Sequence, residues 1–344
     1  YFKYEKRRKV ITQAFTCFVV PKAILSAGGK PVFVDIEENS LNFNLKNLLK
    51  VYDDDVGVII TQNTFGVPNG ELEQIVNFCQ DKKILLIENL AHSFGAKYKG
   101  NFLGNFGDVA LVSFSRTKTI SSIFGGVLVI NKEKLKEEFS KFYDSFNQTV
   151  SKLFIKRILL YALLMMKARD NFSTYGKFLM TIIRKSGLIV KEISTKEKLG
   201  GGEEYLLAKM PEELAKLAIH QLRKIVKFNE HREKLAKIYL KEGLIPYGEK
   251  PSEAEYFYLR YPLTNINPNK LREKLKKFNI YLGNWYNSPL APLEKRLDRF
   301  GYYYGMCPNA ERLSLIIYNL PTNILTTPDD AYFITEMIKK WGIS

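Results

Sequence analysis

Short apolar runs separated by helix-like stretches fill the chain between Lys9 and Asn131 and constrain its fold more than any other feature. One helical pattern, over residues 72–79, lies between two of these runs. Strands that are apolar on both faces and separated by helices are typical of a mostly parallel α/β sheet. The sequence therefore predicts an α/β fold with such a sheet in its N-terminal part. The predicted strands cover residues 32–34, 58–60, 84–87, 109–114 and 127–130.

The rest of the chain predicts further, separate parts. One long helical pattern runs over residues 210–240, with apolar residues near the 3.6-residue period. After it, we expect strands at 256–261 and 280–282 and helices at 269–278 and 328–341. The predicted plan is a large α/β domain over 1–150, a basic and apolar insert over 151–209, a linking helix over 210–245 and a small C-terminal α/β domain over 246–344.

The composition excludes several classes of protein. With 46% hydrophobic and 26% charged residues, the 344-residue chain is neither disordered nor fibrous. Its three cysteines are widely spaced and it has only three histidines, so we expect neither a metal site nor a disulfide framework. The same cysteine usage predicts a reducing, cytoplasmic compartment. No GxGxxG follows a predicted strand and no GxxxxGKS or GxxxxGKT occurs, which argues against Rossmann and P-loop nucleotide sites.

The net charge of +16 favours polyanionic partners such as nucleic acid, an anionic membrane or phosphorylated metabolites. No nucleic-acid-binding motif accompanies the charge, so we predict no nucleic-acid partner. Residues 151–209 hold twelve Lys and Arg against five Asp and Glu, a local charge of +7. They include a nearly uncharged segment that begins at Leu153 and ends at Met166. We expect a core or dimer-contact helix there, and the alternative is a helix lying in the plane of a membrane surface.

One lysine is placed for chemistry. Lys118 follows the predicted strand at 109–114, and open α/β sheets bind ligands at the carboxyl ends of their strands. A partly desolvated lysine there has a lowered pKa, which makes its free amine available to form a Schiff base. Ser113, at the end of the same strand, is suited to bind a phosphate. The alternative is that Lys118 is an ordinary loop lysine.

Segments along most of the chain match those of one protein family in order and spacing. They are VIT from Val10, AILSAGGKPVFVDI from Ala23, FGVP from Phe65, IENLAHSFGAKYKG from Ile87, LGNFGDVALVSFSRTK from Leu103, GGVLVIN from Gly125, MPEELAKLAIHQL from Met210, and NIYLGNWYNSPLAP and NLPTN near the C-terminus. In these segments the chain resembles the DegT/DnrJ/StrS family of sugar aminotransferases, which depend on pyridoxal 5′-phosphate and have fold type I. The resemblance implies a large domain with a mostly parallel sheet and a small C-terminal α/β domain.

The resemblance also implies a role for each site residue. Lys118 would form the Schiff base with pyridoxal 5′-phosphate, and Ser113 would contact the cofactor phosphate. Asn89 occupies the position of an aspartate that pairs with the pyridine nitrogen. The remaining positions are Ala91 against a ring face, His92 near the ring substituents, Cys17 where family members stack an aromatic residue, and Asn63 and Trp285 near the sugar substrate or ring.

The implied reaction transfers an amino group, with glutamate as the expected donor, to a nucleotide-linked keto-sugar for surface glycan or other sugar biosynthesis. A homodimer is implied too. Four features depart from the family pattern: Asn89, Cys17, residues 207–209 in place of an Asn-Tyr-Arg stretch, and a phosphate loop that we expect upstream of Tyr1. They leave two alternatives open, a catalytically impaired member with a binding or scaffold role and a pyridoxal-phosphate-dependent sugar dehydratase.

Overall fold

The computed structural model describes residues 5–170, 175, 176, 178, 181, 182, 190–202, 207–293 and 295–341. The chain forms two compact units. The first unit holds the chain up to Val112, Leu128–Asn131 and the chain from Ile225 onward. The second unit holds Ser113–Val127 and Lys132–Lys224. Each unit is described by itself.

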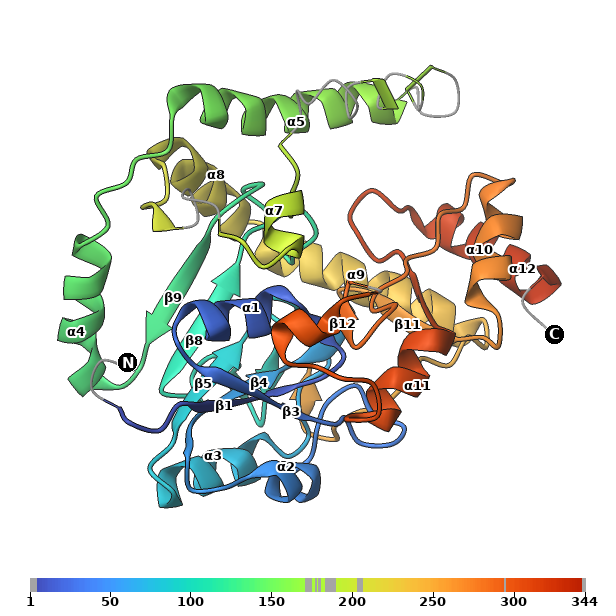
Figure 1. The fold of residues 1–344 in the computed structure, drawn as a ribbon. Coiled ribbons are helices and arrows are strands. Elements are labelled where there is room, and N and C mark those ends of the chain that lie inside the picture. Colours follow the sequence, from blue (N-terminus) through green and yellow to red (C-terminus); the bar gives the residue numbers. More distant parts are fainter. Residues whose placement is uncertain are drawn as a thin grey trace. The chain divides into compact units, whose positions relative to one another are not determined.

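A six-stranded sheet forms the centre of the first unit (Figure 1). The pairs β3–β1, β1–β4, β4–β5 and β5–β8 are all parallel, which confirms the predicted mostly parallel sheet. All five predicted apolar runs are strands of this sheet. In spatial order the strands are β3 (Lys30–Val34), β1 (Lys9–Gln13), β4 (Val56–Gln62), β5 (Leu85–Asn89), β8 (Val109–Ser113) and β9 (Gly126–Ile130).

Helices α2 (Leu45–Val51) and α3 (Leu72–Asp81) bury one face of the sheet (Figure 1). Leu48 of α2 and Ile75 of α3 belong to the same buried cluster as the strand residues Ile11, Ile59 and Leu86. Each such side chain contributes roughly 1.5–3 kcal/mol on burial. The predicted helix at 72–79 is confirmed by α3, because its buried positions recur at helical spacing.

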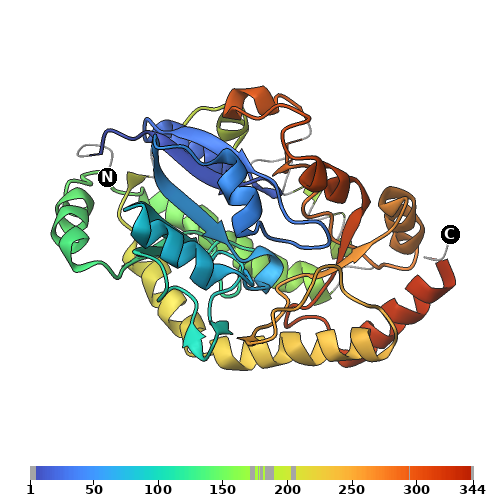
Figure 2. The ribbon, with the colours of Figure 1, turned by 90° about the horizontal axis from the view of Figure 1, so that it is seen from below.

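The C-terminal part of the first unit mixes helices with short strands. Strands β11 (Tyr261–Thr264) and β13 (Ile317–Leu320) pair antiparallel. Helix α9 (Ile225–Lys241) packs against α12 (Pro328–Trp341), which runs beside it in Figure 2. The predicted helices at 269–278 and 328–341 are confirmed by α10 (Pro268–Lys276) and α12. The other elements of this unit are β2 (Thr16–Cys17), α1 (Val19–Ser26), η1 (Thr64–Gly66), β6 (Lys97–Tyr98), β7 (Asn101–Phe102), β10 (Ala254–Glu255), β12 (Leu290–Ala291), η4 (Leu297–Phe300) and α11 (Pro308–Ile316).

Three expectations for this half of the chain are wrong. The helix predicted over 210–240 is two helices, α8 (Glu212–Leu222) and α9, separated by a turn. The strand predicted at 256–261 forms no ladder over 256–260, because Leu259 N–H donates to Phe65 O and the Tyr258 and Leu259 carbonyls accept from Thr322 Oγ1. The strand predicted at 280–282 is absent from the described structure, where Ile280 N–H instead closes the end of α10 on Leu275 O.

The second unit is mainly helical. Its core contains Ile123, Ile158 and Leu214, with Phe154 and Tyr161 packed against them. The predicted helix over the apolar segment is confirmed by α5, which buries Ile155 and Ile158 on one side. No helix within the described residues is long and apolar enough to cross a bilayer. The helices of this unit are α4 (Glu133–Asp144), α5 (Lys152–Asp170), α7 (Thr195–Lys198) and α8.

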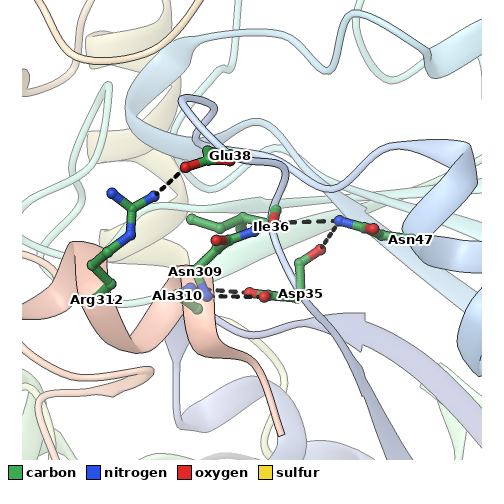
Figure 3. Close-up of polar contacts among 7 residues, drawn as sticks. All are labelled: Asp35, Ile36, Glu38, Asn47, Asn309, Ala310 and Arg312. Atoms are coloured by element: carbon green, nitrogen blue, oxygen red, sulfur yellow. Dashed lines mark hydrogen bonds and ion pairs between the residues drawn. The ribbon is translucent and has the colours of Figure 1, made fainter. Parts of the chain in front are cut away.

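A half-buried carboxylate fastens α11 to the end of strand β3 (Figure 3). Asp35 follows β3 and accepts hydrogen bonds from Asn309 N–H and Ala310 N–H, both at 2.9 Å, in the first turn of α11. These N–H groups have no partner inside the helix, and the positive end of the helix dipole favours an anion there. Asn309 Nδ2 also donates to Ile36 O at 3.0 Å. The contact therefore holds the C-terminal part of the unit on the sheet.

Asp35→Ala should destabilise the protein by about 1–2 kcal/mol, because two helix N–H groups lose their acceptor. Asp35→Asn should lose less, since its amide oxygen still accepts one bond. Chemical denaturation measures both variants against Asp81→Ala, a change at an exposed helix end that we expect to stay within about 0.5 kcal/mol of wild type. Equal stability of Asp35→Ala and wild type would contradict the proposed anchoring role.

Wild type and Asp35→Asn also test how the stability depends on pH. Burial raises the pKa of the Asp35 carboxyl above its usual 3.8, although the N–H groups of Asn309 and Ala310 oppose the shift. When folding raises the pKa of an acid, the folded protein loses stability as the pH rises from the unfolded pKa to the folded pKa. The stability advantage of wild type over Asp35→Asn should therefore shrink as pH increases from 3.8. Unfolding titrations across that range would show the reverse slope if folding lowered this pKa.

Candidate active site

Amide side chains end three neighbouring parallel strands of the first unit. Gln13 ends β1, Gln62 ends β4 and Asn89 ends β5, and all three are buried. The carboxyl ends of parallel strands meet at one edge of the sheet, which is the usual ligand position in open α/β folds. We call this the carboxyl edge. The sequence analysis singled out Asn89 but missed Gln13 and Gln62, although a polar residue that closes an apolar strand is a usable signal.

Hydrogen bonds tie the first two amides together. Thr16 Oγ1 donates to Gln62 Oε1 at 2.6 Å, and Gln62 Nε2 donates to Thr64 Oγ1 at 2.9 Å. Gln13 Nε2 donates to the same Thr64 oxygen at 3.0 Å. Such a closed network fixes the loops that follow β1 and β4.

Asn63 begins the turn after β4 and has one amide atom unused. Its Oδ1 accepts from Asn69 N–H at 2.9 Å, while its buried Nδ2 has no hydrogen-bond partner within the described part of the chain. The buried hydroxyls of Thr61 and Ser93, near the ends of β4 and β5, also have no hydrogen-bond partner within the described residues. Native proteins rarely leave buried polar atoms without a partner, so these atoms are suited to receive a polar ligand.

Close backbone packing explains the glycine in this turn. Gly66 has φ +102°, and a Cβ built there would lie 2.1 Å from the Phe257 carbonyl oxygen. Only glycine fits, because any side chain would push residue 257 away from the turn. The FGVP segment thus has a packing reason for its glycine.

Asn89 is held by its own loop. Its Oδ1 accepts a hydrogen bond from Ala91 N–H at 3.1 Å, which orients the carboxamide at the end of β5. Beside it, Glu88 turns into the interior and accepts three backbone hydrogen bonds, from the N–H groups of Gly104, Phe106 and Gly107 at 2.7–2.9 Å. Burial raises the pKa of the Glu88 carboxyl, and the three N–H groups oppose that rise. Glu88 therefore organises the loop, and Asn89 is the residue presented at the edge.

His92 is fixed on both ring nitrogens. Phe65 N–H donates to its Nδ1 at 3.2 Å, which assigns the proton of the neutral ring to Nε2. That nitrogen lies 3.3 Å from Tyr286 Oη and donates to it. The His92 ring stacks on Phe65 and on Tyr286, with centroids 5.9 and 5.8 Å apart. Full burial raises the pKa of Tyr286 well above its usual value, so its phenol stays protonated.

The segment that carries Trp285 and Tyr286 reaches this edge through strand pairing. Strand β12 pairs in parallel with β2, which places Ala291 opposite Cys17. Trp285 N–H donates to Asn319 Oδ1 at 3.0 Å, and its ring centroid lies 6.3 Å from that of His92. Cys17, which forms no disulfide, is close enough to Tyr286 to influence its pKa. The structure thus brings Cys17, His92 and Trp285 together, and Tyr286 is a further site residue that the sequence analysis missed.

Ser113 and Lys118 belong to the second unit. Ser113 is the last residue of β8, and its Oγ lies 3.5 Å from Ser115 N, which donates to it. Lys118 N–H donates to Ser115 O at 3.2 Å, which closes a turn around a half-buried Lys118. Arg116 in the same turn stacks on Tyr161, with its guanidinium carbon 3.8 Å from the ring centroid. The turn after β8 is therefore an ordered one.

The model of the DegT/DnrJ/EryC1/StrS aminotransferase family matches residues 1–155 and 179–339. The chain belongs to this family. DegT-family aminotransferases depend on pyridoxal phosphate, and a putative sugar aminotransferase of Streptococcus pneumoniae with this fold is known in its pyridoxal-phosphate and pyridoxamine-phosphate forms. That structure has a TM-score of 0.73 in the pyridoxal-phosphate form at 19% identity, and the match covers 98% of this chain and 81% of that one.

Further relatives agree with this assignment. A DegT/DnrJ/EryC1/StrS aminotransferase of Brucella abortus has a TM-score of 0.72 at 18% identity, over 99% of this chain and 81% of that one. An uncharacterized protein of Methanocaldococcus jannaschii is 29% identical over 96% of this chain and 79% of its own. The UDP-4-amino-4,6-dideoxy-N-acetyl-beta-L-altrosamine transaminase of Campylobacter jejuni is 26% identical over 69% of this chain and 52% of its own. This DegT-family chain therefore has the fold of the pyridoxal-phosphate-dependent aminotransferases.

Tyr286→Phe should destabilise this DegT-family protein by about 0.5–1.5 kcal/mol, because the buried His92 Nε2–H loses a hydrogen-bond acceptor while the stacked rings remain. Denaturant unfolding measures the change. Tyr303→Phe, on an exposed tyrosine, serves as the matched control and should leave the stability unchanged. If both variants behave alike, the His92–Tyr286 bond does not stabilise the carboxyl edge.

Proposed function

We propose that the chain is a pyridoxal-phosphate-dependent aminotransferase that acts on a nucleotide-linked keto-sugar, with Lys118 as the residue that holds the cofactor covalently. The observation that carries the proposal is a half-buried lysine in the ordered turn after β8 of a DegT-family chain. Relatives named as nucleotide-sugar enzymes support the substrate class. Among them are a GDP-perosamine synthase of Escherichia coli, which is 32% identical over 37% of this chain and 35% of its own, and the Campylobacter transaminase.

The residues present fit such a cofactor. The proposal assigns Ser113 Oγ to the phosphate, the Asn89 amide to the ring nitrogen, Ala91 to a ring face and the His92 region to the ring substituents. Cys17 and Trp285 would border the ring and the sugar, and the unpartnered Asn63 Nδ2 would donate to a ring or sugar oxygen. When bound, pyridoxal phosphate supplies an electron sink for the carbanion that forms during amino transfer.

Within this proposal Lys118 has a second task. The Lys118 amine would also serve as the base for proton transfer, and proton transfer by a positioned group contributes about 10²–10⁴-fold to rate. Glutamate is the proposed donor. A homodimer and a cytoplasmic location remain predictions that accompany the proposal.

Asn89 makes the proposed site differ from one that has a charged carboxylate at the ring nitrogen. Its Oδ1 is occupied by Ala91 N–H, so the Nδ2 amide is the group left to contact a ring nitrogen. An amide N–H favours the unprotonated nitrogen, whereas a carboxylate favours the protonated one. The unprotonated ring is a weaker electron sink. This observation favours a second candidate function, a catalytically impaired binding or scaffold member, or a sugar dehydratase with altered chemistry.

Lys118→Ala should abolish the visible absorbance band that added pyridoxal phosphate gives with wild-type protein, because that chromophore requires a lysine imine. Transamination with glutamate should fall by at least about 10²-fold. Lys136→Ala, on an exposed lysine of α4, controls for adventitious surface reaction and should keep the band. A band that survives Lys118→Ala would refute the assignment of this lysine.

Asn89→Asp should tighten cofactor binding by about fivefold to thirtyfold, because a charge-assisted hydrogen bond replaces a neutral one. Spectral titration with pyridoxal phosphate measures the affinity. Asn89→Ala should weaken binding relative to wild type, which separates loss of the contact from gain of the charge. Weaker binding by Asn89→Asp than by wild type would mean that the site is built around a neutral partner, in favour of the second candidate function.

A further inference from the structure

Helix α5 is apolar on two opposite sides, and only one of them is covered within its unit. Ile155 and Ile158 are buried, and Ile158 packs in the core of the second unit with Ile123 and Leu214. On the other side, Leu153 is 68% exposed and Leu163 is 59% exposed. A helix that is apolar all round is normally covered all round. Among the residues that the structure describes, none covers the outer side of α5 at Leu153 and Leu163.

The spacing of the outer residues places them on a single stripe. Leu153, Lys156, Leu160 and Leu163 follow one another at intervals of three, four and three residues, which keeps them on one face of a helix. Lys152 and Lys156 are both exposed beside the leucines. We call these five residues the outer stripe. It alternates aliphatic side chains with long cationic ones, whose stems are apolar and whose ammonium groups reach outward.

Three further apolar residues that the structure describes after α5 are exposed. Phe178 is 70% exposed, and Tyr175 and Ile182 are also exposed. Most of this region, residues 156–178, lies outside the segments that the family model matches.

We propose that the outer stripe and the exposed residues after it dock on an anionic lipid surface. Residues 151–209 carry a net charge of +7, which complements acidic headgroups. A second copy of the chain would bring the same positive charge to a self-complementary contact, so like charges would face each other across it. Lipid meets both needs, because it accepts the leucines and neutralises the lysines.

The packing of α5 sets its orientation on the membrane. One side of α5 packs on its own unit, so the helix lies parallel to the membrane surface with the outer stripe facing the lipid. Leu153, Leu160 and Leu163 enter the boundary between headgroups and acyl chains, while the lysines extend to the phosphates. Both terms contribute, since binding strength follows the buried apolar area and the attraction to anionic lipid.

The test uses the full chain and sedimentation with vesicles. Equimolar phosphatidylglycerol and phosphatidylcholine vesicles should carry the protein down, and pure phosphatidylcholine vesicles should carry down at least tenfold less. Leu153→Ser with Leu163→Ser should reduce the partition coefficient at least tenfold, and Lys152→Gln with Lys156→Gln should reduce it severalfold. Raising the salt to 1 M, where the Debye length is about 3 Å, should reproduce the loss caused by the lysine changes.

Matched controls separate the stripe from general effects. Ile266→Ser removes an apolar side chain that is exposed elsewhere, and Lys46→Gln removes an exposed charge on α2. Both should bind vesicles like wild type, and all variants should unfold at the wild-type temperature. Equal sedimentation with the two kinds of vesicle, or none with either, would overturn the proposal. So would a wild-type dimer that Leu153→Ser with Leu163→Ser converts to a monomer without changing vesicle binding.

Discussion

The half-buried carboxylate of Asp35 contacts the first turn of α11, and the rest of the first unit depends on this contact. It joins the end of an early strand to a helix more than two hundred residues later in the chain, through hydrogen bonds from Asn309 N–H and Ala310 N–H that are both 2.9 Å long. The parallel pairing of β2 with β12 makes a second such connection. Together they bring Trp285 and Tyr286 to the strand ends, where Tyr286 Oη accepts a hydrogen bond from His92 Nε2. The candidate site therefore exists only when distant parts of the chain have assembled.

Neutral amides dominate the carboxyl edge. Gln13, Gln62, Asn63 and Asn89 all lie there, and none of them carries a charge that burial would penalise. The hydrogen bonds that Gln13 and Gln62 make with Thr16 and Thr64 hold the loops in place. A phosphorylated ligand would bring its own charge to this edge. Asn89 follows the same pattern, since an amide replaces a carboxylate at the position expected to tune the ring.

The sequence predicted the sheet well because parallel strands are buried on both faces and stand out as continuous apolar runs, as in β4 and β5. The roles of Asn89, His92 and Trp285 stay predictions from the resemblance, although the structure places the rings of His92 and Trp285 near each other. The sequence could not predict Tyr286, whose role depends on the pairing of β12 with β2, a long-range contact without a local signature. The break between α8 and α9 was missed because Leu222 and Ile225 continue the apolar period across the turn. Residues 256–260 were assigned to a strand because their composition suits one, but their backbone groups bond to Phe65 and Thr322 instead.

The central functional claim is that Lys118 is the covalent anchor of a pyridoxal phosphate. Borohydride reduction of the protein with bound cofactor, followed by proteolysis and peptide mass spectrometry, tests it most directly, because reduction makes a lysine–cofactor bond permanent. The structure predicts one stoichiometric modification on the peptide that contains Lys118. Modification spread over exposed lysines such as Lys136, with Lys118 unmodified, would contradict the claim and leave a binding or scaffold role as the better explanation.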